Sequence, residues 1–171
     1  MVKRLQSFME SGIHLAIITD EIEENIESRV TSFFKDKSKL HIFSDGGAIG
    51  FGFKKEIIDE YFRFRFCQSQ ERKIEEVVTR IFGHFSWEPD PSIYRYGIQL
   101  SREPTIKEIN EIENSLQEFG ITETMSYLGR RILRFNPFGK HRALKYFLET
   151  TKTDEKDVII IADQTAKYRN D

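Results

Sequence analysis

The order of apolar and polar positions in the first third of the chain predicts alternating helices and strands. Residues 3–11 have helical spacing, and residues 14–20 (HLAIITD) form a short apolar run typical of a strand buried on both faces of a parallel sheet. Residues 21–35 return to helical spacing, and residues 40–53 predict a second buried strand, a glycine-rich turn and a returning strand. This strand–helix–strand order predicts a right-handed parallel crossover unit.

From about Glu56 the pattern changes to the period of two that is typical of a sheet with one packed face and one wet face. In chain order it predicts a strand at 61–66, a helix at 71–85, a loop at 87–92, a strand at 93–101, a helix at 105–120 with a capping box, and a strand–turn–strand at 122–135. The middle of the chain therefore predicts an antiparallel sheet with two helices.

The last third of the chain returns to the α/β pattern. After the turn at 136–139, an amphipathic helix begins at Lys140, and an apolar strand at 158–161 runs towards Asp163. We therefore predict an α/β fold with a Rossmann-like parallel-sheet core and an inserted α+β cap that contains an antiparallel sheet. The predicted parts are a first core part at 1–55, the cap at 56–128 and a second core part at 129–171.

Composition excludes several classes of partner. The 26 Lys and Arg residues nearly balance 28 Asp and Glu residues, so bulk charge gives no reason to expect nucleic acid or an anionic membrane as a partner. Cys67 is the one cysteine, which excludes an internal disulfide and a thiolate metal cluster. No segment approaches the roughly 20 apolar residues of a membrane span, and the first residues lack the apolar run of a signal peptide. We expect a cytoplasmic protein.

Four short motifs follow one another along the chain. SGIHLAIITD places Thr19 at the end of a strand, SDGGAIGF forms a turn after the next strand, PFGKHRALKYFLE places Lys140 at the head of a helix, and VIIIADQ ends a strand at Asp163. Their order and spacing resemble the haloacid dehalogenase superfamily, in particular its class-two-capped sugar-phosphate phosphatases of the sucrose-phosphate and mannosyl-phosphoglycerate type. The resemblance covers nearly the whole chain, although each motif is short.

The resemblance implies a role for each motif. In the family, an aspartate attacks phosphorus, and the charge on the phosphoryl oxygens is balanced by a fixed cation and a hydroxyl, the catalytic roles that would fall to Lys140 and Thr19. Mg²⁺ prefers oxygen ligands, so Asp163 would be its ligand from the strand end. Candidate substrate contacts are the turn at Asp45, Gly46 and Gly47 and the cap residues Arg130 and Arg131.

Each candidate also has a purely structural interpretation. Thr19 could be a strand-end or helix-capping hydroxyl, and Asp20 could cap the following helix. Lys140 could face solvent, although a cation at a helix start is unfavourable without a nearby anion. Asp163 could cap a turn.

The sequence also departs from the family. It contains no Asp-x-Asp motif, which in the family supplies the nucleophile and its acid/base partner. The resemblance implies that residues 3–11 correspond to the helix that follows this motif. We therefore expect an apparently incomplete, Mg²⁺-dependent phosphatase-family protein that acts on or binds a phosphorylated sugar or small metabolite. A fragment, a degenerate homologue, or a nucleophile from another chain would each account for the gap.

Two other hypotheses stay open. One is a catalytically inactive homologue that serves as a ligand-binding or protein-interaction module. The other is an unrelated small α/β protein, in which Thr19, Lys140 and Asp163 would lie far apart. A parallel sheet without the missing strand has an exposed edge, and a homodimer is one way to cover it.

Overall fold

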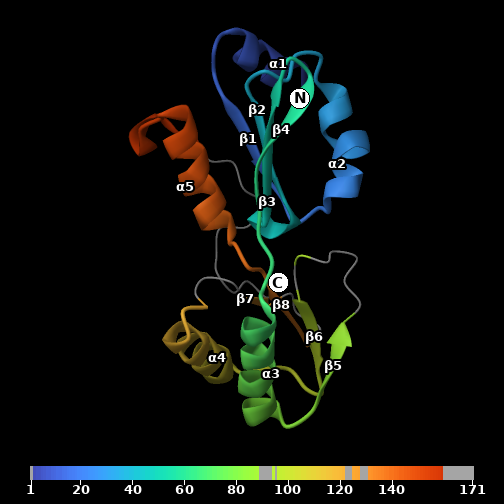
Figure 1. The fold of residues 1–171 in the computed structure, drawn as a ribbon, viewed down its shortest axis with the longest axis vertical. Coiled ribbons are helices and arrows are strands. Elements are labelled where there is room, and N and C mark those ends of the chain that lie inside the picture. Colours follow the sequence, from blue (N-terminus) through green and yellow to red (C-terminus); the bar gives the residue numbers. More distant parts are fainter. Residues whose placement is uncertain (1, 89–93, 95, 122–124, 128–130, 160–171) are drawn as a thin grey trace. The chain divides into compact units, whose positions relative to one another are not determined.

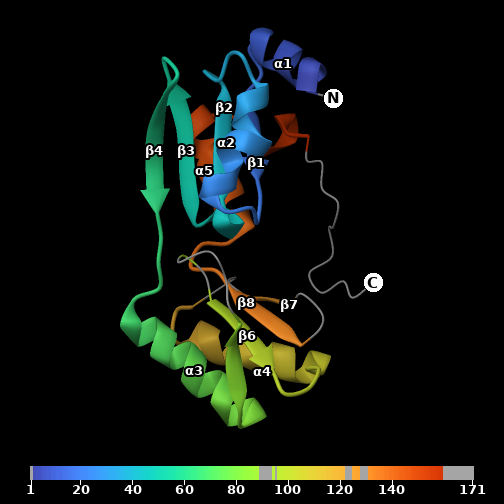
Figure 2. The same cartoon turned by 90° about the vertical axis from the view of Figure 1, so that its right-hand side faces the viewer.

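The computed structural model describes residues 2–88, 94, 96–121, 125–127 and 131–159 (Figures 1 and 2). The chain divides into two compact units. Unit 1 comprises Met1–Phe64 and Phe138–Ile160, and unit 2 comprises Arg65–Pro137 and Ile161–Asp171. The two units are described separately below.

Unit 1 contains a mixed four-stranded sheet in the order β1-β2-β3-β4. Its strands are β1 (Leu15–Ile18), β2 (Leu40–Ser44), β3 (Ile49–Lys54) and β4 (Ile57–Arg63). β1 and β2 are parallel, with Leu15 opposite Leu40, whereas the β2–β3 and β3–β4 pairs are antiparallel. The predicted parallel crossover and the returning strand after the glycine-rich turn are therefore confirmed.

Helices cover both faces of this sheet, and α2 and α5 lie on opposite sides of its strands (Figure 1). The helices of unit 1 are α1 (Val2–Glu10), α2 (Glu23–Arg29) and α5 (Lys140–Thr151), with 3₁₀ turns at Thr31–Phe33, Asp45–Gly47 and Glu155–Asp157. Helix α5 packs Ala143, Phe147 and Leu148 against Phe43 of β2. This contact holds the amino end of α5 near the carboxyl ends of β1 and β2.

Burial differs between the two parallel strands. All five residues of β2 are buried, whereas the four residues of β1 are half-buried. Among the residues that the structure describes, β1 has a strand neighbour on one side only. The prediction that residues 14–20 are buried on both faces is therefore wrong for β1, because in this sheet it is an edge strand.

Strand β4 lies in a different sheet from the one that the sequence predicts. Its residues, which include the start of the YFRFRF run, pair with β3 in unit 1 instead of joining the antiparallel sheet of the cap. The hairpin turns at Lys55 and Glu56, both of which have positive φ (51° and 66°). This backbone suits a two-residue hairpin turn, but Lys and Glu are not the residues that usually signal one.

Two glycines of β3 shape the face of the sheet that packs against α5. A Cβ at Gly50 would lie 2.7 Å from the Phe62 ring, and one at Gly52 would lie 2.1 Å from the Tyr61 hydroxyl. The register shifts at Gly50/Phe51, so the consecutive residues Tyr61 and Phe62 both pack in the α5-side cluster. The glycines therefore leave room for two aromatic rings to cross β3 towards β2.

Aromatic rings also meet at the boundary between the units, on the unit 1 side. The rings of Phe64 and Phe138 stack with centroids 4.5 Å apart and planes at 11°, and Phe62 packs against Phe138. Phe64 is the last residue before the chain enters unit 2, and Phe138 is the first after it returns. The two crossing points of the chain are thus held together by a stacked pair.

Unit 2 is an antiparallel sheet with two helices. Its elements are α3 (Gln68–Phe82), β5 (Phe85–Glu88), β6 (Tyr96–Leu100), α4 (Ile106–Glu118), β7 (Met125–Tyr127) and β8 (Ile132–Phe135), with the sheet order β5-β6-β8-β7. The two helices share a core with β6 and β8, which includes Ile74, Ile112, Ile98 and Leu133. The predicted capping box is confirmed, because Thr105 Oγ1 accepts a hydrogen bond from the Glu108 amide at 3.3 Å.

Two sequence predictions for unit 2 need correction. Residues Trp87 and Glu88, predicted to lie in a loop, end strand β5, which pairs with β6. Strand β8, placed by the sequence in the second core part, pairs with β6 and β7. Together the units confirm the predicted fold class, an α/β sheet with parallel strands and a separate antiparallel α+β part. No helix among the described residues has the length and apolar character needed to cross a bilayer.

Candidate functional site

Thr19 directly follows β1 and is held by backbone contacts. Its amide donates to the Phe43 carbonyl at 2.8 Å, and its side-chain Oγ1 accepts a hydrogen bond from the Glu21 amide at 3.1 Å. The hydroxyl thus has the turn-forming role of the structural interpretation. A hydroxyl can accept and donate at the same time, so the Thr19 proton remains available to an acceptor from outside.

The turn after β2 ties this segment to its neighbour. The amide of Asp45 donates to the Glu21 carbonyl at 2.9 Å, and the amide of Gly46 donates to the Thr19 carbonyl at 3.0 Å. The Asp45 side chain is buried, and its Oδ2 accepts a hydrogen bond from the Glu23 amide at the start of α2. Asp45 and Gly46 thus hold the end of β1 in place, and their amides are engaged inside the protein.

Gly47 brings the same turn against the start of α5. Its φ is +97°, and a Cβ there would lie 3.2 Å from the carbonyl oxygens of Phe138 and Gly139 and from Cβ of Ala143. A side chain would be strained at this φ and crowded against the backbone of the neighbouring segment. The glycine therefore permits the close approach of the turn to the amino end of α5.

Lys140 is the first residue of α5. The residue before it, Gly139, has no side chain with which to cap the helix. The Lys140 Nζ forms an ion pair with Asp20 Oδ2 at 2.6 Å, with the two side chains 51% and 47% exposed. Asp20 thus supplies the anion that a cation at a helix start requires.

The carboxyl ends of β1 and β2 and the amino end of α5 therefore form one cluster in unit 1. It contains Thr19, Asp20, the Asp45–Gly47 turn and Lys140, so the structure brings five of the candidates together. We call this cluster the α5 site. Asp20 carries the ion pair, although from sequence its favoured role is that of a helix cap.

The remaining candidates are Arg130, Arg131 and Asp163. Arg131 lies in unit 2, where its Nη1 donates to the Ser101 carbonyl at 3.1 Å. Arg130 and Asp163 lie outside the described residues. Val158 and Ile159, at the start of the predicted last strand, are in no strand, and Ile159 is 89% exposed. The predicted roles of Arg130, Arg131 and Asp163 stay predictions.

The described residues contain no group of three or more His, Cys, Asp or Glu side chains placed to hold a metal ion. Of the two carboxylates of the α5 site, Asp20 pairs with Lys140 and Asp45 accepts a hydrogen bond at the start of α2. The described part of the chain thus lacks a complete set of Mg²⁺ ligands, and the magnesium prediction depends on Asp163.

A second polar cluster lies at the amino ends of the same strands and was not recognised from sequence. His14 Nδ1 and His41 Nε2 are 2.9 Å apart, and His41 Nδ1 is 2.7 Å from the Tyr61 hydroxyl. Burial, and then the charges of His14 and Lys39, lower the pKa of His41 to about 4, whereas burial raises the pKa of Tyr61 to about 12. Both shifts favour the neutral forms, so His14, His41 and Tyr61 form a chain of hydrogen bonds in which His41 and Tyr61 are uncharged. The sequence signal is the position of the two histidines at the starts of two apolar runs, with His14 directly before β1 and His41 as the second residue of β2.

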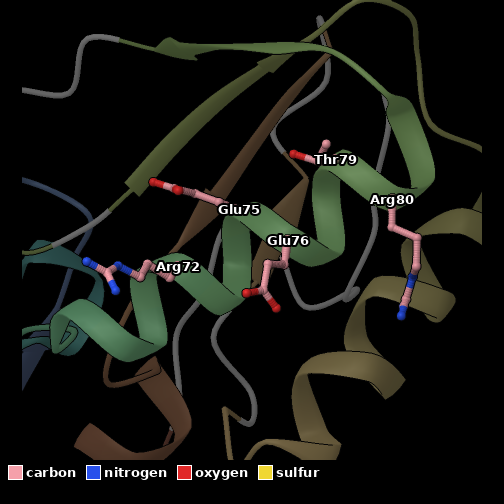
Figure 3. A pocket seen from close by; sticks show the side chains of 5 residues that line it. All are labelled: Arg72, Glu75, Glu76, Thr79 and Arg80. Atoms are coloured by element: carbon pink, nitrogen blue, oxygen red, sulfur yellow. The ribbon is translucent and has the colours of Figure 1, made fainter.

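Unit 2 has a shallow hollow on the outer side of α3, lined by Arg72, Glu75, Glu76, Thr79 and Arg80 (Figure 3). Its two anions, Glu75 and Glu76, lie between two cations, and the outer one, Arg80, donates to Ser115 of α4 at 2.7 Å. No candidate from the sequence lies in it. Balanced charge of this kind is typical of a solvated helix face.

Comparison with solved structures finds phosphatases of the haloacid dehalogenase superfamily. The Plasmodium falciparum IMP-nucleotidase matches 91% of this chain with a TM-score of 0.62 and 12% sequence identity. The sucrose-phosphatase of Synechocystis sp. PCC6803, solved with sucrose and phosphate, matches 90% with a TM-score of 0.54 and 12% identity. The Aspergillus fumigatus trehalose-6-phosphate phosphatase matches 91% with a TM-score of 0.53 and 13% identity.

These likenesses concern the fold, because the sequence identities are low. The match spans 47% of the IMP-nucleotidase, 63% of the sucrose-phosphatase and 59% of the trehalose-6-phosphate phosphatase, so the chain is about half to two thirds the extent of these proteins. By sequence, no family model and no curated protein matches. The chain thus shares its fold with these proteins.

Proposed function

We propose that this chain binds the phosphoryl group of a phosphorylated sugar or related small metabolite at the α5 site, as a protein of the haloacid dehalogenase phosphatase type. The observation that carries the proposal is the half-exposed Lys140 at the start of α5, already in contact with an anion on Asp20, the residue after Thr19. The likeness to phosphatases of nucleotide and sugar monophosphates supports the choice of ligand class.

Each group of the α5 site has a chemical role in this proposal. The Lys140 ammonium would form a charge-assisted hydrogen bond with a phosphate oxygen, and the Thr19 hydroxyl would donate a second. The first amides of α5 point out of the helix and favour negative charge at that end. Asp45, Gly46 and Gly47 would position these donors through the contacts that they make inside the protein.

Magnesium belongs to the proposal through Asp163, since the described residues alone do not complete its ligand set. When bound, Mg²⁺ would offset the charge of the phosphate oxygens. Phosphate binding by Lys140 and Thr19 does not depend on the metal in this proposal.

Hydrolysis of a phosphate ester distinguishes two versions of the proposed function, an enzyme and an inactive binding protein. The sequence contains no Asp-x-Asp motif, so we expect this chain to hydrolyse p-nitrophenyl phosphate poorly or not at all. That expectation favours the second candidate, an inactive homologue that binds a phosphorylated ligand or a partner. Robust hydrolysis that is lost in Lys140→Ala would instead assign an enzyme with a nucleophile elsewhere in the chain.

Calorimetric titration with inorganic phosphate tests the binding step. We expect saturable binding that weakens roughly tenfold or more in Lys140→Met, since a hydrogen bond to a charged group contributes about 1.5–3 kcal/mol. The matched control is Lys145→Met, which removes an equal charge from an exposed position of the same helix. Equal loss in both variants would refute the proposal, and so would a lack of phosphate binding both by the unchanged chain and by Asp20→Asn.

A further inference from the structure

We infer that Asp20 is a built-in competitor of phosphate, an internal carboxylate that occupies Lys140 until a phosphorylated ligand displaces it. This inference rests on the proposed function. It concerns the same site, and it assigns Asp20 a role in setting ligand affinity. The two oppositely charged groups lie 120 positions apart in the chain and meet at 2.6 Å.

The contact is fixed by the backbone on both sides. Asp20 follows Thr19, whose amide and carbonyl are bonded to Phe43 and Gly46 respectively. Lys140 follows Gly139, whose carbonyl oxygen would lie 3.2 Å from a Cβ on Gly47. Because Gly46 and Gly47 belong to one turn, that turn holds the two partners of the ion pair at a set separation.

The exposure of the pair shows that it can open at low cost. Both side chains are about half exposed, and ion pairs of this kind contribute about 0–1 kcal/mol to stability. The ion pair therefore adds little to the stability of the fold, and stability is a weak explanation for a carboxylate at position 20. A ligand can reach Lys140 from solvent and exchange one anion for another.

The charge of a ligand determines how Asp20 affects its binding. The Lys140–Asp20 pair has no net charge, whereas a phosphate monoester brings up to two negative charges. An incoming phosphate must either break the ion pair or accept a carboxylate beside it, and each outcome weakens binding. Weakly charged or neutral molecules would not displace Asp20, because they interact with the Lys140 ammonium no more strongly than the Asp20 carboxylate does.

A different role for Asp20 predicts the opposite result. If Asp20 served to orient the Lys140 ammonium towards phosphate, its loss would weaken binding. The sign of the change in phosphate affinity on removing the carboxylate therefore distinguishes a competitor from a positioning residue.

The experiment is calorimetric titration of inorganic phosphate, at low ionic strength and without added metal, into the full chain and its variants. We expect Asp20→Asn to bind phosphate roughly three- to tenfold more tightly, Asp20→Glu to bind like the unchanged chain, and the gain to vanish in Asp20→Asn/Lys140→Met. Asp157→Asn, which removes an exposed carboxylate elsewhere in unit 1, should leave the affinity unchanged. Asp20→Ser is a second charge-removing variant in case Asp20→Asn folds poorly.

The outcomes separate the two proposals. Phosphate binding by the unchanged chain with equal or weaker binding by Asp20→Asn and Asp20→Ser would overturn the competitor role and leave the proposed function intact. Phosphate binding that appears only after Asp20 is replaced would support both. No binding by the unchanged chain or by either variant would overturn both.

Discussion

Acid should destabilise unit 1 through the hydrogen-bonded chain of His14, His41 and Tyr61. His41 is buried, and its pKa is lowered to about 4 from an ordinary value of 6.5. A histidine whose pKa is lowered on folding stabilises the protein while it is neutral. Its contribution is complete above pH 6.5, falls as the pH drops, and is lost below about pH 4.

The size of this effect follows from the two pKa values. Each pKa unit corresponds to about 1.4 kcal/mol, so protonation of His41 should remove about 3 kcal/mol of unfolding free energy between pH 6.5 and pH 4. This is a large share of the 5–15 kcal/mol or so by which domains are stable. Burial, and then the charge of Lys39, also lower the pKa of His14, which acts in the same direction.

The assay compares the pH dependence of urea unfolding in the unchanged chain and in His41→Gln. Far-UV circular dichroism follows the whole chain, and the single tryptophan, Trp87, reports on unit 2 alone. We expect the difference in unfolding free energy between the two proteins to shrink by about 3 kcal/mol from pH 7 to pH 4, while the Trp87 signal shows no such difference. Parallel pH dependences in both proteins, or a His41 imidazole that titrates near pH 6.5 by NMR, would refute this reasoning.

Two further predictions concern packing and capping. Gly52→Ala places a Cβ 2.1 Å from the Tyr61 hydroxyl, so Tyr61 should lose its hydrogen bond to His41. The free energy of unfolding in urea should fall by roughly 1–3 kcal/mol. A Tyr61 side-chain signal that is unchanged by NMR would contradict this. Thr105→Ala removes the oxygen that accepts a hydrogen bond from the Glu108 amide at the start of α4. It should lower the free energy of unfolding by about 1 kcal/mol, measured by urea unfolding followed at Trp87. The control Thr79→Ala, on the exposed side of α3, should not lower it, and equal losses in both variants would rule out the capping explanation.

The parts of the fold that could be predicted are those with contiguous signals. The crossover from β1 to β2 and the following hairpin each follow from apolar runs separated by polar or glycine-rich segments. The sequence does not predict the correct sheet for β4, because its partner depends on a turn at Lys55 and Glu56, whose positive φ the residue types do not indicate. It does not predict β5, because Pro89 and Pro91 follow this strand closely and give the segment the pattern of a loop.

The α5 site could be predicted in part for the same physical reason. Thr19 and the Asp45–Gly47 turn follow parallel strands, and the carboxyl ends of parallel strands meet at one edge of a sheet. The partner of Lys140 could not be predicted, because the choice between Asp20 and other carboxylates depends on how closely Gly47 lets α5 approach. The bond between His14 and His41 likewise depends on strand register, and the reach of Tyr61 to His41 depends on Gly52.

The stacked pair of Phe64 and Phe138 has a consequence for how this chain can vary. Because the two rings touch, the ends of the intervening segment already lie side by side, and joining them costs little further chain entropy. The segment can thus be lengthened, exchanged or removed while the contact between Phe64 and Phe138 keeps its two ends together. An engineer could replace residues 65–137 with a short turn and expect the remaining sheet and helices to keep their connections.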